Sequence, residues 1–234
     1  MTGAVQPAAV RRRIRIPLRF ADGYATSATV VSFTGLADEQ QHVALVLGRP
    51  AAAAAGLPLV RLHSECLTGD VFGSQRCDCG PQLREAVERI AAHGGYVLYL
   101  RQEGRGIGLY DKLDAYALQD RGLDTYDANI ALGHQADERD YTSAAQMLQA
   151  LGASRIALLT NNPDKGAQLA RLGVTIARRI PTGLHLNGAN AAYLAAKAER
   201  GGHDLLPRDP ERAAGPHRHS GPAAGPAPQG IADR

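Results

Sequence analysis

The sequence predicts an α/β fold in which a mixed β-sheet is flanked by helices. Strand-like and helix-like patterns alternate through the later part of the 234-residue chain, as they do in α/β domains. Three strand-like runs come first without a helix between them, which favours an antiparallel or mixed start to the sheet. No internal repeat or convincing linker interrupts residues 13–206, so we expect a single domain there.

Seven short runs have the composition of strands. They are rich in aliphatic, β-branched and aromatic residues, and they cover residues 13–20, 25–33, 42–48, 59–65, 96–100, 155–161 and 174–180. Five further segments have helical periodicity, and several end at a glycine as helix C-caps do. These predicted helices cover residues 81–94, 107–122, 142–153, 164–173 and 189–202.

The two ends of the chain differ in composition from its centre. Residues 207–234 hold six of the 13 prolines, and Ile231 is their only aliphatic residue larger than alanine. Such a segment cannot bury enough surface to offset its ordering entropy, so we expect a disordered tail. His217 and His219 could touch a metal, but a solvated low-complexity segment is the simpler interpretation. Residues 1–12 are predicted to form a shorter flexible arm.

Composition and charge exclude several classes of function. The net charge is only +3, from 26 basic and 23 acidic residues, which favours small anionic ligands over nucleic acid. The chain has no Trp and 5% aromatic residues, so base-stacking platforms for single strands are not expected. No apolar run is long enough for a signal peptide or a membrane span, and we therefore expect a cytoplasmic protein without a membrane partner.

All three cysteines, Cys66, Cys77 and Cys79, lie in one short stretch. An odd number of clustered thiols in a reducing compartment favours metal binding over disulfides. Three thiolates suit zinc and would leave a fourth position for water, as in catalytic sites. Two alternatives remain open: no metal at all, or a closed site with His63 as fourth ligand. The second needs a break in the strand, because positions 63 and 66 of a strand point to opposite faces.

The tripeptide HSE at residues 63–65 also matches half of the signature of zinc nucleobase deaminases. In that family the glutamate of H-x-E is the proton shuttle, and the other half of the signature reads P-C-x-x-C. Here it reads RCDCG, which is one residue short and lacks the proline. The deaminase interpretation is therefore weak.

Two polar turns after predicted strands are candidate anion sites. Residues 101–112, RQEGRGIGLYDK, combine glycines with Arg101, Arg105 and Lys112 but match neither a Walker loop nor a dinucleotide fingerprint. Residues 158–166, LLTNNPDKG, place Lys165 near a helix N-terminus. A cation there opposes the helix dipole, so it suggests a bound anion, although a solvated lysine is the ordinary alternative.

A third polar segment, residues 135–142, is dense in charge. Asp137 and Arg139 occupy alternate positions, which share one face if the segment is extended, and they could enter a site together. The alternative is that the carboxylates only complement the dipole of the following helix.

Taken together, these stretches resemble one family. They read RLHSECLTGDVFGSQRCDCGPQL, RQEGRGIGL, AYALQD, DTYDAN, LGHQADERDYT and LLTNNPDK. In their order and spacing they are similar to GTP cyclohydrolase II, over roughly residues 40–205. The family usually has Asn at the position of Asp111, and the first ~40 residues match only weakly.

The resemblance implies a single catalytic domain over 13–206, a homodimer, and two metals. Zinc would be held by Cys66, Cys77 and Cys79 with water in the open position, and an activated water would attack C8 of guanine, open the imidazole ring and release formate. Magnesium would serve the release of pyrophosphate. The product would be 2,5-diamino-6-(5-phosphoribosylamino)pyrimidin-4(3H)-one, the first intermediate of riboflavin biosynthesis.

The resemblance also implies roles for individual residues. Arg139 matches the proposed nucleophile at the α-phosphate and Asp137 its proton acceptor; a purely charge-stabilising Arg139 is the alternative, because a protonated guanidine is a poor nucleophile. Tyr116 matches a tyrosine near the ring-opening site, and a packed core tyrosine is its alternative. Glu103 could accept hydrogen bonds from N1 and the exocyclic amine of guanine. The GTP contacts implied are Arg61, His63, Ser64, Glu65, Gln82, Glu103, Gly104, Arg105, Thr125, Thr160 and Lys165.

Two alternative functions remain open at this point. One is a zinc-stabilised GTP sensor without catalysis, and the other is a variant cyclohydrolase that stops at the formylated product.

Overall fold

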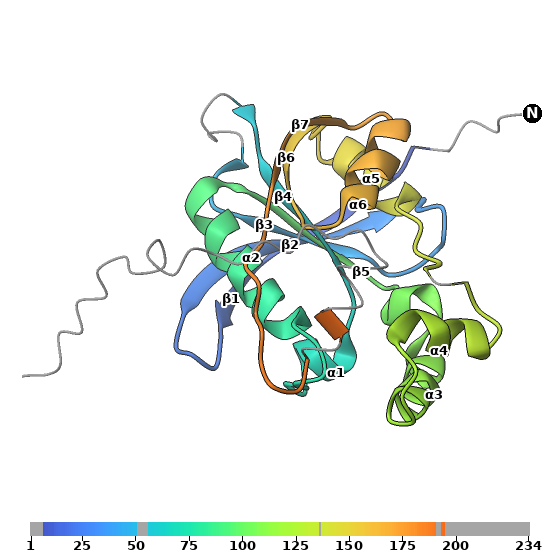
Figure 1. Cartoon of the computed structure of the whole chain (residues 1–234). Coiled ribbons are helices and arrows are strands. Elements are labelled where there is room, and N and C mark those ends of the chain that lie inside the picture. Colours follow the sequence, from blue (N-terminus) through green and yellow to red (C-terminus); the bar gives the residue numbers. More distant parts are fainter. Residues whose placement is uncertain (1–6, 51–55, 136, 191–192, 195–234) are drawn as a thin grey trace, which may run out of the picture.

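The computed structural model describes residues 7–50, 56–135, 137–190 and 193–194, and it confirms the α/β prediction (Figure 1). Seven strands form one mixed sheet in the order β1-β2-β3-β5-β4-β6-β7. The strands are β1 Ala9–Arg19, β2 Ala25–Thr34, β3 Val43–Leu47, β4 Leu59–Ser64, β5 Gly95–Leu100, β6 Arg155–Leu159 and β7 Thr175–Ile180.

Within the described residues, six α-helices and one short 3₁₀ helix lie between these strands. They are α1 Leu67–Asp70, α2 Cys79–His93, η3 Glu103–Gly106, α3 Leu109–Gln119, α4 Thr125–Ala131, α5 Thr142–Ala150 and α6 Pro163–Arg171. Pro163 is the first residue of α6, where its missing N–H costs no hydrogen bond. Cys79 begins α2, so Pro81 stands within the first turn rather than at the predicted first position.

The sheet has an antiparallel half and a parallel half. Short connections join β1 to β2 and β2 to β3. The antiparallel pairs are β1 with β2, β2 with β3 and β3 with β5. Strands β5, β4, β6 and β7 run parallel, and helices make their crossovers, as parallel connections require. The prediction of an antiparallel start is therefore confirmed.

Helices cover both faces of the parallel half (Figure 1). Ala86, Val87 and Ile90 of α2 pack in one core cluster with Leu59. The other cluster contains Val60, with Met147, Leu148 and other residues of α5 and Leu169 of α6. The neighbouring side chains of Leu59 and Val60 thus lie on opposite faces of the sheet, because side chains alternate along a strand. The same strand also buries Arg61 and His63, and polar side chains in a central strand need partners.

The structure differs from the predicted elements in three places. Pairing with β2 continues back to Ala9, so the predicted flexible arm over 1–12 is too long. The short helices α1 and α4 were not predicted, because four and seven residues carry little periodicity. The predicted helix over 189–202 lies mostly outside the described residues, and the predicted tail over 207–234 lies wholly outside them.

Within the part of the chain that the structure describes, no helix combines the length and the apolar composition that crossing a bilayer requires.

Candidate active site

The carboxyl ends of the four parallel strands meet at one cavity. Ser64 ends β4 and Leu100 ends β5, and polar loops follow both strands as well as β6 and β7. Ligands of open α/β sheets bind in the crevice at this edge. The cavity has an empty volume of about 1050 Å³, which includes the open space at its mouth.

The cavity brings together nearly all the candidate residues predicted from the sequence. Asp137 and Arg101 do not line it, and Arg101 Nε donates instead to Glu65 Oε2. The candidates that line it are Arg61, His63, Ser64, Glu65, Cys66, Cys77, Cys79, Gln82, Glu103, Gly104, Arg105, Lys112, Tyr116, Thr125, Arg139, Thr160 and Lys165. Asp137 pairs with Arg139 beside the cavity. Segments far apart in sequence therefore form one site.

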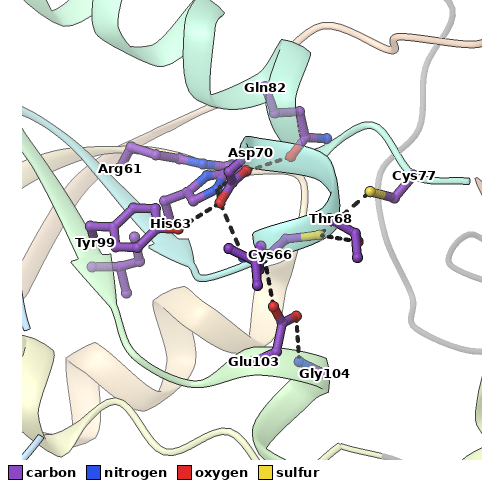
Figure 2. Close-up of polar contacts among 12 residues, drawn as sticks. Arg61, His63, Cys66, Thr68, Asp70, Cys77, Gln82, Tyr99, Glu103 and Gly104 are labelled. Carbon is purple, nitrogen blue, oxygen red and sulfur yellow. Dashed lines mark hydrogen bonds and ion pairs between the residues drawn. The ribbon is translucent and has the colours of Figure 1, made fainter. Parts of the chain in front are cut away.

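The three cysteines form a compact group at this edge, and Figure 2 shows two of them, Cys66 and Cys77. Cys66 precedes α1, Cys77 lies in the loop that follows, and Cys79 opens α2. Their Sγ atoms all lie within 4.8 Å of one another, and those of Cys66 and Cys77 are 3.6 Å apart. Tetrahedral zinc with Zn–S bonds near 2.3 Å would space its sulfurs by about 3.8 Å. The donor set and its spacing therefore fit zinc.

His63 does not join this group. In the described chain the group contains only the three cysteines, and His63 Nε2 faces the carboxylate of Asp70 at 3.0 Å. A closed site with His63 as fourth ligand is thus not what the side chains form. Hydrogen bonds from Cys77 and Cys79 lower the pKa of Cys66, which favours a thiolate there.

Gly69 allows the sulfurs to approach one another. It lies in α1, and a Cβ at this position would stand 2.8 Å from Cys77 Sγ and 3.1 Å from Cys66 Sγ. Gly80 plays the matching part in α2, where a Cβ would meet the Gly69 carbonyl oxygen at 2.5 Å. Both positions therefore require glycine for α1 and α2 to close around the cysteines.

Lys112 connects the cysteines to Glu103. Its Nζ donates to Glu103 Oε1 at 2.7 Å, to Cys66 Sγ at 3.2 Å and to Thr68 Oγ1 at 3.1 Å. Burial disfavours the charged form, but the hydrogen bond to Glu103 and the charges of Cys66 and Glu103 outweigh it and raise the pKa of Lys112. The sequence placed Lys112 in an anion-binding loop, whereas the structure places it against the metal site.

Glu103 is already well supplied with donors (Figure 2). Its Oε2 accepts the Leu67 N–H at 2.7 Å, and its Oε1 accepts the Gly104 N–H at 2.9 Å as well as Lys112 Nζ. A carboxylate offers about four acceptor positions, so about one remains. Glu103 holds α1, and hence Cys66, against the loop after β5.

A second buried network lies beside the cysteines on the α2 side. Arg61 Nη2 donates to Gln82 Oε1 at 2.5 Å, and Gln82 Nε2 donates to Asp78 Oδ2 at the same distance. Asp78 stands between Cys77 and Cys79 and is fully buried. Burial lowers the pKa of Arg61, and the charge of Asp78 opposes that shift. This chain of contacts ties β4 to the start of α2.

Arg139, which lines the cavity, forms a bidentate ion pair with Asp137. Arg139 Nε donates to Asp137 Oδ1 at 2.8 Å, and Nη2 donates to Oδ2. Burial alone would suppress the charge of Arg139, but Asp137 and its other neighbours raise the pKa of the guanidinium. Arg105 lies 4.0 Å from Asp137 and stacks on Tyr126 at 4.2 Å, from a left-handed backbone conformation with φ 66°. The predicted Asp137–Arg139 proximity is thus present.

The loop after β6 supplies further polar groups. Thr160 Oγ1 accepts the Asn162 N–H at 3.0 Å, and the Asn162 side chain caps α6 by accepting the Asp164 N–H. Lys165 is buried, and its Nζ donates to the Leu62 carbonyl at 2.8 Å. Lys165 is therefore not the solvated lysine that was the alternative at this position.

Tyr116 stands one helical turn after Lys112 on α3 and also lines the cavity. Burial raises its pKa, and Arg76 stacks on its ring at 4.9 Å. Its hydroxyl is consequently protonated and can donate a hydrogen bond.

Unpartnered polar atoms gather in the wall of this cavity. Among the described residues, six buried side-chain N or O atoms lack a hydrogen-bond partner. Four of them, Arg61 Nε, His63 Nδ1, Asn129 Nδ2 and Thr182 Oγ1, belong to residues that line the cavity. Buried polar atoms without partners are rare and costly, so this grouping indicates a polar ligand.

Sequence reasoning missed several of these residues. Asn129 lies one turn after Thr125 on α4, so helical spacing could have suggested it. Helical spacing gives no signal for Asp70, Tyr99 and Thr182. The fold alone brings them to their contacts with His63 and with the cavity.

Comparison with known proteins identifies relatives over most of the chain. The model of the family described as GTP cyclohydrolase II matches residues 12–181. The GTP cyclohydrolase-2 of Vibrio parahaemolyticus is 50% identical over 193 residues, which cover 82% of this chain and 97% of that protein. The enzyme of the same name from Psychromonas ingrahamii is 49% identical over 193 residues, 82% and 96% of the two chains. That of Azospirillum brasilense is 51% identical over 191 residues, 81% of this chain and 48% of that protein.

Proposed function

This chain belongs to the GTP cyclohydrolase II family of enzymes, and from that premise we propose that it hydrolyses GTP with release of formate and pyrophosphate. The product would be the diaminopyrimidine ribosyl monophosphate that begins riboflavin biosynthesis. The observation that carries the proposal is the convergence of three thiols and several cationic side chains on one cavity at the carboxyl edge of the sheet.

We assign zinc to Cys66, Cys77 and Cys79, whose sulfur spacing supports the assignment. When bound, zinc supplies Lewis-acid activation of a water molecule at neutral pH. Lys112 would hold the Cys66 sulfur in place. Tyr116, protonated and in the cavity wall, would position the attacked part of the substrate by a hydrogen bond. Tyr116→Phe should then slow formate release more than pyrophosphate release.

The phosphate end of the substrate is assigned to cationic side chains of the cavity wall. Arg105, Arg139 and Lys165, with Thr160, would bind the triphosphate, and magnesium would enter with it, since Mg²⁺ is commonly held through substrate phosphates. The raised pKa of Arg139 supports a charge-stabilising role over a nucleophilic one. Rapid-quench trapping of a covalent nucleotide on Arg139 would overturn that preference.

The base end of the substrate is assigned to the loops around Glu103. With about one acceptor position left, Glu103 can take one N–H of guanine but not both donors that the base presents. A second acceptor is therefore needed. The remaining predicted contacts, Arg61, Ser64, Glu65, Gln82, Gly104 and Thr125, line the same cavity and complete the proposed binding site.

Product analysis tests the function directly. Zinc-loaded protein is incubated with GTP and magnesium, and nucleotide, pyrophosphate and formate are followed together by mass spectrometry, with metal-stripped protein as the control. We expect the deformylated product with both leaving groups. A formylated product would indicate the variant cyclohydrolase, and unchanged GTP with binding intact would indicate a sensor.

We also propose that the protein is a cytoplasmic homodimer. The support is the family resemblance and the three cysteines, which form no disulfide and suit a reducing compartment. Light scattering at several protein concentrations tests the dimer.

A further inference from the structure

His63 is a buried histidine whose two ring nitrogens differ in their surroundings. Nε2 lies 3.0 and 3.1 Å from the two carboxylate oxygens of Asp70 (Figure 2). Nδ1 is buried and has no hydrogen-bond partner in the described structure. Because His63 forms part of the cavity wall, a molecule bound in the cavity is the natural source of the missing partner.

Asp70 decides which nitrogen of His63 carries the proton. Its Oδ2 accepts the Tyr99 hydroxyl at 2.9 Å and the Cys66 N–H at 3.0 Å. A backbone N–H can only donate, so Asp70 acts as an acceptor and His63 must donate to it through Nε2–H. In a neutral imidazole the proton on Nε2 leaves Nδ1 as an acceptor.

The surroundings of His63 favour that neutral ring. Burial lowers the pKa of His63 most, the contact with Asp70 opposes the shift, and the charges of Arg61 and Lys165 lower the pKa further. The Tyr99 ring stacks on the imidazole with centroids 5.6 Å apart and limits its rotation.

A second buried histidine shows what is particular to His63. His42 also directs Nε2 at an aspartate, Asp38 Oδ2, at 2.7 Å. Its Nδ1 accepts the backbone N–H of Arg101 at 2.8 Å, so both ring nitrogens are satisfied within the protein. His42 does not line the cavity. In both pairs Nε2 faces an aspartate carboxylate. Only His63, in the cavity wall, leaves Nδ1 without a partner.

We propose that Asp70 is a positioning residue that holds His63 as the Nε2–H tautomer, so that Nδ1 accepts a hydrogen bond from the bound nucleotide. The proposal rests on GTP as the ligand. Guanine presents N1–H and an exocyclic amine, Glu103 has about one acceptor position left, and His63 Nδ1 supplies the second acceptor. His63 thereby contributes to the choice of guanine over adenine.

The substitution Asp70→Asn inverts the tautomer in a defined way. The new amide must keep its oxygen toward the Cys66 N–H, because that group cannot reverse. Its NH₂ group then takes the place of Oδ1, 3.0 Å from His63 Nε2, with the retained oxygen 3.1 Å from the same nitrogen, and we expect the NH₂ group to donate to Nε2. The imidazole proton moves to Nδ1, which becomes a donor and opposes a donor of the substrate.

The measurement combines ¹⁵N NMR of histidine-labelled, zinc-loaded protein with nucleotide binding in the absence of magnesium. We expect the Nε2–H tautomer for His63 in the parent protein, a shift of the Nδ1 resonance on addition of GTP, and the Nδ1–H tautomer in Asp70→Asn. The Kd for GTP should rise about tenfold in the variant at unchanged zinc content. ITP, which lacks the amine, and 2′-deoxy-GTP identify the donor: the nucleotide whose Kd changes least lacks the group that His63 contacts.

Asp38→Asn is the matched control. The Arg101 N–H holds His42 Nδ1 as an acceptor, so its tautomer and the Kd for GTP should stay as they are. A parent His63 in the Nδ1–H form, or an inverted tautomer with unchanged GTP binding, would overturn the proposal. If Asp70→Asn does not fold, the parent protein alone tests the proposal: an Nδ1 resonance of His63 that does not shift when GTP binds would overturn it. These readouts need no turnover, so failure of the proposed reaction would be seen separately in the product analysis.

Discussion

The antiparallel and parallel halves of the sheet treat their buried polar groups differently. No residue described on β1, β2 or β3 has a buried side-chain atom without a partner, and the ring of His42, just before β3, is satisfied at both nitrogens. In the parallel half, Arg61 and His63 of β4 each leave one buried nitrogen unpaired, and Thr182 after β7 leaves its hydroxyl unpaired. The halves also differ in depth of burial, since β4, β5 and β6 bury most of their residues and β1 buries none.

The unpaired polar atoms of the parallel half indicate where a ligand can form hydrogen bonds with the protein. Both halves contribute apolar residues to the two core clusters. Besides their depth of burial, the halves differ in how many buried polar groups lack a hydrogen-bond partner, and each such group costs about 1–3 kcal/mol until a ligand pairs it. Substitutions at the parallel edge should therefore act on metal and substrate, and substitutions in the antiparallel half should act on stability alone.

Gly69→Ala should have the largest effect. The new Cβ would stand 2.8 Å from Cys77 Sγ and 3.1 Å from Cys66 Sγ, so the thiols must move apart. We expect zinc affinity and turnover to fall at least ~100-fold, because metal ligands tolerate little displacement. Competition with a chelator measures the affinity.

The control for this substitution is Gly166→Ala. Gly166 is also helical, but a Cβ there meets only Leu158 Cδ2 at an ordinary 3.7 Å. Alanine should leave zinc affinity unchanged and, as a better helix former, slightly stabilise the fold. Equal zinc affinity in both alanine variants would contradict the role assigned to Gly69.

Lys112→Met should have the next largest effect. It leaves the buried Glu103 carboxylate without its cation and removes the N–H···S bond to Cys66. Breaking a buried pair from one side costs about 3–5 kcal/mol, and loss of a group that supports a metal ligand lowers metal affinity about 10- to 100-fold. Urea unfolding and chelator competition measure the two effects.

The double variant Lys112→Met with Glu103→Gln separates the effect on stability from the effect on zinc affinity. It removes the unpaired charge, so most of the stability should return while zinc affinity stays low. In cobalt-substituted protein, the thiolate charge-transfer bands should move in both variants. Full recovery of zinc affinity in the double variant would show that Lys112 acts only through Glu103.

Much of the fold was predictable from local patterns, and the reasons are visible in particular elements. Central strands such as β4 and β5 are short apolar runs, and α2 and α6 show helical periodicity with a proline near the start. Helices α1 and α4 are too short for a periodic signal. The strand order, in which β5 lies between β3 and β4, depends on packing between distant segments and leaves no local trace.

The site was predictable where residue type itself carries the chemistry. Three clustered cysteines indicate a metal from spacing alone, whereas Gln82 and Thr125 were found only through the family resemblance. Lys112 was identified as a candidate anion-binding residue, but its contact with Cys66 was not predictable, since it joins residues 46 positions apart. Asp70 and Tyr99 act through His63, and a supporting role of this kind becomes visible only when the hydrogen bonds are traced.

Asn129→Ala should have a smaller and unusual effect. Asn129 is buried in α4, and its Nδ2 lacks a partner, so alanine removes an unsatisfied donor and suits a helix better. If the donor serves the nucleotide, KM for GTP should rise about fivefold while the melting temperature stays equal or increases. A lower melting temperature with unchanged KM would instead make Asn129 a structural residue.

Val31→Ala in the antiparallel half should leave the chemistry unchanged. Val31 is fully buried in β2, pairs with Arg13 and Ala44, and packs in the core cluster that α5 covers. Removing two methyl groups there should lower the free energy of unfolding by about 2 kcal/mol, seen as a lower urea midpoint with an unchanged slope. Zinc content, kcat and KM per folded molecule should match the parent, because every group assigned to metal or substrate lies beyond the ends of the parallel strands or in β4. A KM that moved together with the urea midpoint would mean that packing in the antiparallel half also shapes the cavity, and the functional division between the two halves would fail.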